Sequence, residues 1–406
     1  MIKTDMKTQT LKGFRDFLPR EALKRQWLKE KITQVFELWG YDPIETPTLE
    51  PLELFAGQIG EDEKLFFKFK DQGGRDVALR YDQTVPTCRV VGQYNRELTF
   101  PFKRYQIQSA FRAENPQKGR YREFLQCDAD IFGVAGPTAD AEIIALSLDI
   151  YRRLGFKNAK ALINDRVLLK DLPYKAIVAI DKLQKIGEDG VIADMGKKGI
   201  PSDKAKEYLA IVKNLKPNET ITTILDYLKK SGFSEDWYAF DPTIARSFSY
   251  STGSIWEIVV PGFDGGSVLG GERFDKLIEQ VADVSIEGVG FGLGFDRTLD
   301  AAEQFGLIPE LQTSAEVLVT IFGRSLFENS LAIATQLRDS GIKTDLYTDP
   351  NVKLEKQLKY ADQKGIPFVV IIGPKEAEKK EVTVKNLQTK EQKTISVEEL
   401  VNELKK

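Results

Sequence analysis

Residues 102–133, FKRYQIQSAFRAENPQKGRYREFLQCDADIFG, decide the fold that we predict for this chain. They predict two strands joined by a polar turn, because Asn115, Pro116 and Gly119 interrupt the alternation of apolar and polar residues. Successive side chains point to opposite faces of a strand, so one face of this pair is apolar and suits a core. The other face carries these even-numbered residues: Gln106, Gln108, Ala110, Arg112, Glu114, Phe124, Gln126, Asp128 and Asp130.

Two interpretations of this polar face are open. An antiparallel sheet often exposes one of its faces to water. The mixture of a guanidinium at Arg112, a carboxylate at Glu114 and an aromatic ring at Phe124 instead favours a binding cleft. Together with Gln126 and Asp130, these groups could hold a phosphate, a purine edge, a purine ring and an ammonium group.

The composition describes a globular chain and excludes several kinds of chemistry. A length of 406 residues, 42% of them apolar and 29% charged, predicts two or three soluble domains. The chain contains no histidine, which excludes His-based acid–base catalysis, Ser-His triads and most zinc sites. Catalysis would therefore rest on positioning and charge, as phosphoryl and nucleotidyl transfer do. With a net charge of −3, a nucleic-acid partner would need local basic patches.

The sequence predicts a cytoplasmic protein without a membrane partner. No apolar run approaches the roughly 18 residues of a membrane span, and the N-terminus lacks an apolar signal region. Cys88 and Cys127 lie in apolar patterns and are expected to be buried free thiols in a reducing compartment.

The N-terminal part predicts a helix at residues 20–39 and then an extended segment that contains Pro43, Pro47 and Pro51. A proline-bearing strand belongs at an edge or an interface, so this segment could join two subunits. A hairpin follows, with its turn at residues 71–74. Asp82 and Thr84 come after it; they could bind an ammonium group or equally cap a turn.

Several later patterns complete the domain plan. Residues 85–94 and 137–154 predict helices, residues 167–235 a small helical insertion, and residues 242–262 a strand with Arg246 and Tyr250 on one side. Arg246 could be a pocket or a surface residue. Residues 266–281, GSVLGGERFDKLIEQV, predict a glycine turn that enters a helix. Residues 314–406 alternate apolar strands with amphipathic helices, which predicts a separate α/β domain with a mainly parallel sheet.

Glycines at every second position of residues 288–294 leave one strand face almost without side chains. Either a ligand or another backbone lies close to that face, or the strand packs tightly against a helix. Arg297 follows at the start of a helix, where backbone N–H groups favour anions.

Together these stretches resemble the class II aminoacyl-tRNA synthetases, and most closely the histidine–tRNA ligase family, over nearly the whole chain. The segment around Pro47 resembles the first motif of the class, and residues 292–297, GLGFDR, resemble the third. Residues 111–114, FRAE, with residues 119–122, GRYR, and Phe124 resemble the second. The histidine family is indicated by KGFRDFLP at 12–19, RYDQTVP at 80–86, GGERFD at 270–275 and the helical insertion.

The resemblance implies an antiparallel catalytic sheet flanked by helices at residues 1–166 and 236–308, the insertion at 167–235, and an anticodon-binding α/β domain at 314–406. It implies a homodimer formed through the Pro47 segment. It also implies use of ATP, Mg²⁺, histidine and tRNA, without metal ligation by histidine or cysteine.

Roles for individual residues follow from the resemblance alone. Arg112 would hold the α-phosphate of ATP, Glu114 would read the adenine edge and Phe124 would stack on its ring. Arg120 and Arg297 would bind the β- and γ-phosphates.

The amino-acid side of the site follows in the same way. Arg246 matches an arginine that the family uses beside the α-phosphate, where other members of the class use a metal ion. The residues expected to orient the amino acid are Asp82, Thr84, Gln126 and Asp130.

The sequence departs from the family pattern in the pocket for the amino-acid side chain. Tyr250 is followed by Ser251 where the family has a pocket tyrosine, and Phe274 replaces a second tyrosine. Hydrogen-bonding groups give such a pocket its discrimination, so the two changes leave open a ligase for another amino acid.

The predicted reaction is attack of the carboxylate of histidine on the α-phosphorus of ATP, followed by transfer of histidine to the terminal hydroxyl of tRNA. The alternative is a non-charging paralogue that regulates ATP phosphoribosyltransferase. Arg112, Glu114, Arg297 and the C-terminal domain, which that regulator usually lacks, argue against the alternative.

Overall fold

The computed structural model describes residues 8–55, 65–115, 121–246 and 250–405. The chain divides into two compact units: Leu28–Ile308 with the described residues before Phe17, and Phe17–Trp27 with the chain from Pro309 onward. The assignment of residues 1–166 and 236–308, 167–235 and 314–406 to a catalytic domain, an insertion and an anticodon-binding domain stays a prediction.

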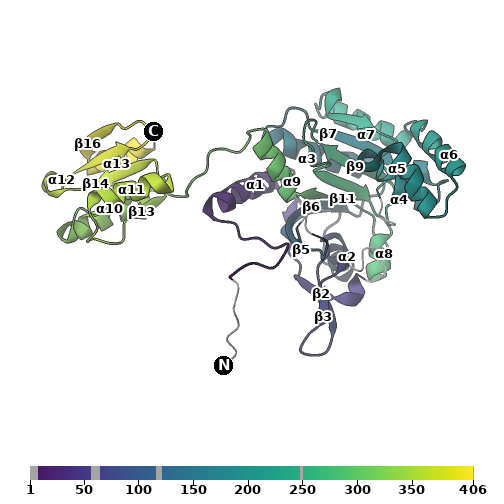
Figure 1. Ribbon diagram of the computed structural model, residues 1–406, viewed down its shortest axis with the longest axis horizontal. Helices are drawn as coiled ribbons and strands as arrows, with labels where there is room; N and C mark the ends of the chain where they lie inside the picture. The colour runs from purple at the N-terminus through teal and green to yellow at the C-terminus, as the bar shows by residue number, and fades with distance from the viewer. Residues whose placement is uncertain (1–7, 56–64, 116–120, 247–249, 406) are drawn as a thin grey trace. The chain divides into compact units, whose positions relative to one another are not determined.

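The described part of the first unit is built on an eight-stranded sheet with the order β1-β5-β6-β11-β10-β9-β7-β8 (Figure 1). Neighbouring strands from β5 to β7 pair antiparallel, as predicted, whereas the outer pairs β1–β5 and β7–β8 are parallel. The strands are β1 Asp42–Pro43, β5 Phe102–Phe111, β6 Glu123–Phe132, β7 Lys160–Asp165, β8 Tyr238–Phe240, β9 Ser254–Val259, β10 Leu269–Arg273 and β11 Gly288–Gly294. A smaller sheet joins β2 Leu49–Pro51, β4 Asp76–Leu79 and β3 Lys68–Lys70, with the hairpin turn where predicted.

Helices cover the odd-numbered, apolar face of the central strands. They include α1 Pro19–Leu38, α3 Pro137–Leu154 and α9 Phe295–Gln304. The α1 side chain of Phe36 stacks on Tyr105 of β5 and lies beside Phe291 of β11. Helices α3 and α9 both contact β6 and β11. Gly155 ends α3 with a φ of 96°, a left-handed conformation that glycine adopts without strain.

The predicted helical insertion contains α4 Tyr174–Ile180, α5 Leu183–Lys197, α6 Ser202–Lys213 and α7 Glu219–Lys230. Helices α4, α5 and α6 share an apolar cluster that includes Ile177, Met195 and Leu209. Helix α7 packs instead on α3, where Tyr227 Oη donates a 2.6 Å hydrogen bond to Glu142 Oε2. Helices α2 Thr84–Gln93 and α8 Leu277–Ala282 also pack together, through Gly92 and Ala282.

The second unit contains a sheet with the order β13-β12-β14-β15-β16. Strand β12 pairs parallel with β13 and β14, but β14–β15 and β15–β16 are antiparallel, so the expected mainly parallel sheet is mixed. Strand β16 was not predicted, because its largely exposed polar residues carry no burial pattern. The elements are β12 Val317–Val319, α10 Phe327–Asp339, β13 Thr344–Leu346, α11 Leu354–Lys364, β14 Phe368–Ile371, α12 Pro374–Lys379, β15 Glu381–Asn386, β16 Gln392–Ser396 and α13 Val397–Leu404.

Two local predictions are wrong. Arg246 is not in a strand; it has a left-handed φ of 48°, and β9 begins only at Ser254. Within residues 266–281 the helix is present as α8, but the glycines expected to form a turn lie in strand β10, where Gly270 pairs with Glu257 on one side and Gly292 on the other. An added Cβ at Gly270 would lie 2.2 Å from Nη1 of Arg246, so the glycine leaves room for that guanidinium. The pattern therefore reflects a tertiary contact and not a turn.

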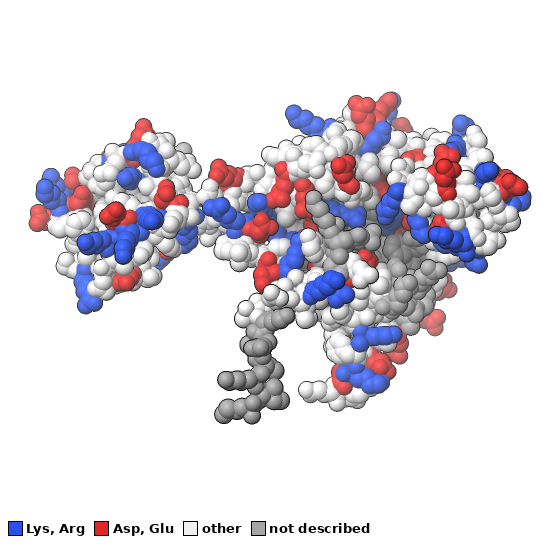
Figure 2. All heavy atoms as spheres, viewed as in Figure 1, with Lys and Arg blue, Asp and Glu red and all other residues white. Residues whose placement is uncertain are grey.

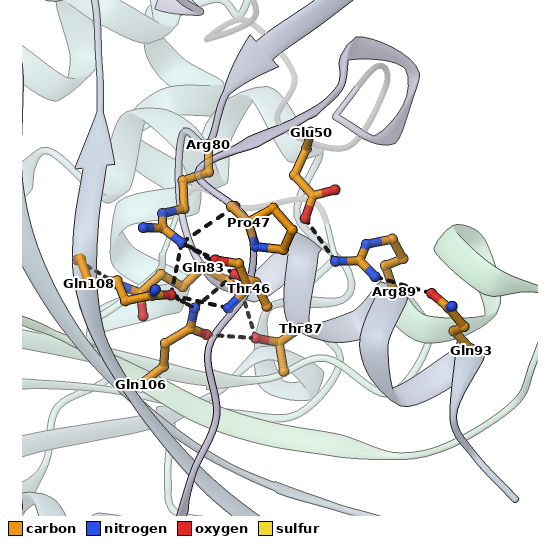
Figure 3. Close-up of polar contacts among 10 residues, drawn as sticks. All are labelled: Thr46, Pro47, Glu50, Arg80, Gln83, Thr87, Arg89, Gln93, Gln106 and Gln108. Carbon is orange, nitrogen blue, oxygen red and sulfur yellow. Dashed lines mark hydrogen bonds and ion pairs between the residues drawn. The ribbon is translucent and has the colours of Figure 1, made fainter. Parts of the chain in front are cut away.

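Buried polar contacts anchor the Pro47 segment to the main sheet (Figure 3). Arg80 is only 2% exposed and donates hydrogen bonds to the carbonyl oxygens of Thr46 and Ser109 and to the side chain of Gln108. Glu50 pairs with Arg89 of α2 at 2.8 Å. The segment is therefore held rigidly from both sides.

Charge is mixed over the molecular surface. Figure 2 shows Lys and Arg interspersed with Asp and Glu on the face that it displays. None of the described helices is both long and apolar enough to cross a membrane. Cys88 and Cys127 are buried free thiols, as predicted.

Paired residues form rows across β5, β6, β11 and β10 on the even-numbered face, so the predicted shared face of β5 and β6 is confirmed. The glycines of β11 are the bare positions in these rows. The rows are Phe102, Phe132 and Gly288; Arg104, Asp130, Gly290 and Glu272; Gln106, Asp128, Gly292 and Gly270; and Gln108, Gln126 and Gly294. A Cβ at Gly290 would lie 1.6 Å from Asp130 Oδ1, so the bare face of β11 gives room to the carboxylate of the neighbouring strand.

We therefore expect Gly290→Ala to destabilise the protein by about 1–3 kcal/mol, because Asp130 must leave its position beside Arg104. Urea denaturation of the purified protein measures this change. Gly196→Ala is the control, since a Cβ there meets no atom within 4 Å and alanine favours a helix interior. Equal midpoints for Gly290→Ala and the wild type would contradict the expectation.

Candidate active site

A cavity of about 680 Å³ opens on the even-numbered face of the central strands. It brings together predicted residues that lie far apart in the sequence. Those lining it are Asp82, Thr84, Arg112, Glu114, Phe124, Gln126, Asp130, Arg246, Tyr250, Phe274 and Arg297. Ser251 forms a hydrogen bond with Glu272, which also lines the cavity. Arg120 lies outside the described residues.

Arg112 lies between two aromatic rings at one end of the cavity. Its Cζ atom is 4.3 Å from the ring centroid of Tyr81 and 5.0 Å from that of Phe124. Its Nε donates a 3.2 Å hydrogen bond to the carbonyl oxygen of Tyr81. Cation–π contacts and this bond hold the guanidinium in one place, where it can offset the charge of a bound anion.

Asp82 and Thr84 are positioned by a residue that the sequence did not single out. The side chain of Gln83, between them, donates to the carbonyl oxygens of Gln108 on β5 and Gln126 on β6, at 2.8 and 3.0 Å. This ties the start of α2 to both central strands. Burial raises the pKa of Asp82, and the charge of Arg112 opposes that shift.

A row of charges crosses the middle of the cavity. Arg104, which is fully buried on β5, forms an ion pair with Asp130 of β6. Gly290 follows on β11, and Glu272 of β10 stands on the far side of that glycine. Burial raises the pKa of Asp130 to about 6 although Arg104 opposes the shift.

Arg246 reaches the cavity from an irregular segment. Its guanidinium lies over Gly270, with Nη2 3.3 Å from Glu272 Oε1 and Nη1 3.7 Å from Glu257 Oε1. Burial would lower the pKa of Arg246, but the two carboxylates raise it, so the group stays charged. A side chain held between two carboxylates is preorganised to meet a phosphate.

Arg297 lies in the first turn of α9, where helix N–H groups favour anions. Its Nη1 donates a 3.0 Å bond to the carbonyl oxygen of Ser267. The neighbouring Asp296 is paired with Arg15 at 2.9 Å, which connects the KGFRDFLP segment to this end of the cavity.

Phe274 and Tyr250 contribute aromatic rings to the lining of the cavity. Phe274 packs edge-on against Phe132 and Tyr250, in a cluster that also contains Cys88 and Ile278. Ser251 does not line the cavity; its hydroxyl donates a hydrogen bond to Glu272.

Sequence reasoning missed several residues that line or support the cavity. Parity could have found Glu272, since it shares a face with Phe274 in the GGERFD motif. No sequence signal pointed to the insertion residues, which reach the cavity only through the tertiary fold. The missed residues are Tyr81, Gln83, Arg104, Tyr121, Asp181, Lys182, Lys185 and Glu272.

The raised pKa of Asp128 predicts that the stability of the protein depends on pH. Burial raises its pKa from 3.8 to about 8; Arg104 opposes the shift and Asp130 adds to it. The folded state therefore binds this proton more tightly than the unfolded chain, and stability falls as the pH rises from about 4 to about 8.

We expect Asp128→Asn to raise the Tm at pH 8.5 by at least ~2–4 °C, with the gain shrinking as the pH is lowered to 5. Differential scanning calorimetry across this range measures the effect. Asp76→Asn, at a side chain 63% exposed, is the control and should change stability little at any pH. A gain that is the same at every pH would show that burial does not perturb Asp128.

Comparisons with known proteins identify the family of this chain. The family model of histidyl-tRNA synthetase matches residues 13–186, and the model of an anticodon binding domain matches residues 316–406. A histidine–tRNA ligase of Wolinella succinogenes is 37% identical over 430 residues, which cover 96% of this chain and 96% of the relative.

Further relatives match over the same extent. The histidine–tRNA ligase of Cytophaga hutchinsonii is 34% identical over 446 residues, covering 97% of this chain and 98% of the relative. The crystal structure of a histidyl-tRNA synthetase from a Nostoc species superposes with a TM-score of 0.85 at 27% identity, covering 98% of this chain and 99% of the other. The chain therefore belongs to the histidine–tRNA ligase family.

Proposed function

We propose that this protein activates histidine with ATP to form histidyl-adenylate and transfers the histidine to the 3′ end of its tRNA. The single observation that carries the proposal is the convergence of Arg112, Arg246 and Arg297 on one cavity that also holds Asp82 and Asp130. Guanidinium groups match the triphosphate, and buried carboxylates match the ammonium group of an amino acid.

The first step needs no protein nucleophile. A carboxylate oxygen of histidine forms a bond to the α-phosphorus of ATP, the bond from that phosphorus to the bridging oxygen breaks, and pyrophosphate leaves. Arg112 and Arg246 offset charge at the α-phosphate, while Arg297 and Arg120 offset it on the leaving group. Glu114 reads the adenine edge, and Phe124 stacks on its ring.

Asp82, Thr84, Gln126 and Asp130 hold the amino acid so that its carboxylate faces the phosphate. In the second step the terminal hydroxyl of the tRNA attacks the carbonyl carbon of the adenylate, and AMP leaves. The α/β unit from residue 314 onward binds the anticodon of the same tRNA.

Mg²⁺ bound together with ATP would supply further positive charge at the phosphates. Magnesium in nucleotide sites is held largely by phosphate oxygens and water, which is compatible with a cavity rich in guanidinium groups. We place the reaction in the cytoplasm, where ATP and tRNA are present.

Histidine-dependent exchange of pyrophosphate into ATP tests the proposal directly. We expect exchange with the wild type, and a loss on the order of 10²-fold or more for Arg112→Ala, because the α-phosphate loses a preorganised cation. Arg75→Ala is the control, since Arg75 is 81% exposed at the tip of a hairpin.

Failure of the wild type to exchange with histidine would remove the proposal. Exchange with a different amino acid, in a screen of all twenty, would establish a ligase of other specificity. Exchange by Arg112→Ala at the wild-type rate would remove the role given to this arginine.

We also propose that two copies of the chain associate through the Pro47 segment. Strand β2 is an edge strand, and Leu49 on it is 40% exposed. The Arg80 and Glu50 contacts hold this edge rigid, and a rigid apolar edge loses little entropy on association.

Sedimentation at micromolar concentration should therefore detect a dimer, and Leu49→Lys should weaken it at least about tenfold because a lysine would be buried at the interface. Leu331→Lys, at a leucine with the same 40% exposure on α10, is the matched control. A monomeric wild type, or a Leu49→Lys dimer as tight as the wild type, would contradict the proposed interface.

A further inference from the structure

We propose that Glu272 is a specificity-determining residue that reads the side chain of the amino-acid substrate, from the side of the pocket opposite Asp130. The inference rests on the proposed function above, in which Asp130 holds the amino acid, and adds Glu272 as a further carboxylate in contact with that substrate. It follows from the position of Glu272 in the sheet, its burial and its partners.

The first step is the row that contains Glu272. Asp130, Gly290 and Glu272 are cross-strand partners on β6, β11 and β10, so their side chains point to the same face. The Cα atoms of Asp130 and Glu272 stand two strand spacings apart, roughly 10 Å. The Asp130 carboxylate takes up the space over Gly290, and all three residues line the cavity. A flat ring in the cavity can therefore meet both the Asp130 carboxylate over Gly290 and the Glu272 carboxylate on the next strand.

The second step is burial. Glu272 is only 5% exposed, and a buried carboxylate requires hydrogen-bond donors. It accepts from Ser251 Oγ and, at 3.3 Å, from Arg246 Nη2. A carboxylate can accept up to about four hydrogen bonds, so a substrate N–H can join these two donors. Ser251 thus acts as a positioning residue for Glu272.

The third step is the chemistry of the ligand. Phe274 forms an apolar wall in the next row, which suits the carbon edge of a ring. Two carboxylates in one row suit a ring with two N–H groups, as imidazole has in its protonated form. A ring of the same size without N–H groups would lie against both buried carboxylates without donating a hydrogen bond to either, and a polar pocket discriminates against such a ligand.

A competing role for Glu272 is to hold Arg246 alone. Glu257 provides the means to separate the two roles. It also lies beside Arg246, with 3.7 Å between Oε1 and Nη1, but it is not among the residues that line the cavity. If Glu272 served only Arg246, loss of either carboxylate charge would have the same kind of effect.

The test compares Glu272→Gln with Glu257→Gln in pyrophosphate exchange, measuring KM for histidine and KM for ATP separately. We expect Glu272→Gln to raise KM for histidine by about 10–100-fold, as the loss of a charged hydrogen bond predicts, with KM for ATP changed less than about threefold. Glu257→Gln should leave KM for histidine within about threefold of the wild type.

A second readout uses 3-(2-thienyl)alanine, whose ring lacks N–H groups. Calorimetry measures the affinity of the protein for this analogue and for histidine. The ratio of the analogue's affinity to that of histidine should be about tenfold higher in Glu272→Gln than in the wild type. Ser251→Ala keeps the charge of Glu272 but removes a donor that positions it, and should raise KM for histidine by a smaller factor, about 3–10-fold.

Thermal unfolding of each variant checks that it is folded. If Glu272→Gln does not fold, the KM for histidine of Ser251→Ala tests the inference instead. Unchanged histidine KM and unchanged thienylalanine discrimination, with normal exchange by the wild type, would overturn this inference and leave the proposed function intact. Equal changes in Glu272→Gln and Glu257→Gln would also overturn it. Absence of histidine-dependent exchange in the wild type would remove the proposed function and the inference with it.

Discussion

The ion pair between Arg104 and Asp130 underlies the arrangement of the site. Both side chains are buried, and Asp130 occupies space that Gly290 leaves empty on the next strand. A buried carboxylate is tolerated only with such a partner, because burial of an isolated charge is very unfavourable. The bare strand β11 and the charged row next to it therefore depend on each other, and the cavity exists because both are present.

In the function that we propose, charge balance takes the place of histidine-based acid–base chemistry. The chain has no histidine, and the cavity instead sets guanidinium groups against carboxylates. Arg246 illustrates the principle, since Glu272 and Glu257 keep it charged despite its burial. Groups held in this way change little when a substrate arrives, and catalysis of phosphate chemistry depends on such preorganisation.

The fold was predictable wherever a period in the sequence matches a regular element. The alternation in residues 102–133 predicted the paired faces of β5 and β6, and the apolar stripe in residues 137–154 predicted α3 at the same boundaries. Prediction failed at Arg246 and at Gly270. The left-handed φ of Arg246 and the missing side chain of Gly270 both accommodate the contact between these two residues, which lie in different segments. No local pattern records such a contact.

The residues of the candidate site also fall into those that the sequence predicts and those that only the tertiary structure brings together. The sequence by itself determined which face of the central strands carries Arg112, Gln126 and Asp130, because side-chain direction along a strand depends only on parity. Only the tertiary structure decided that Glu272, Gln83 and the insertion helices meet that face. Strand order and register join residues that are more than a hundred positions apart, and these are set by packing of the whole core rather than by any local stretch.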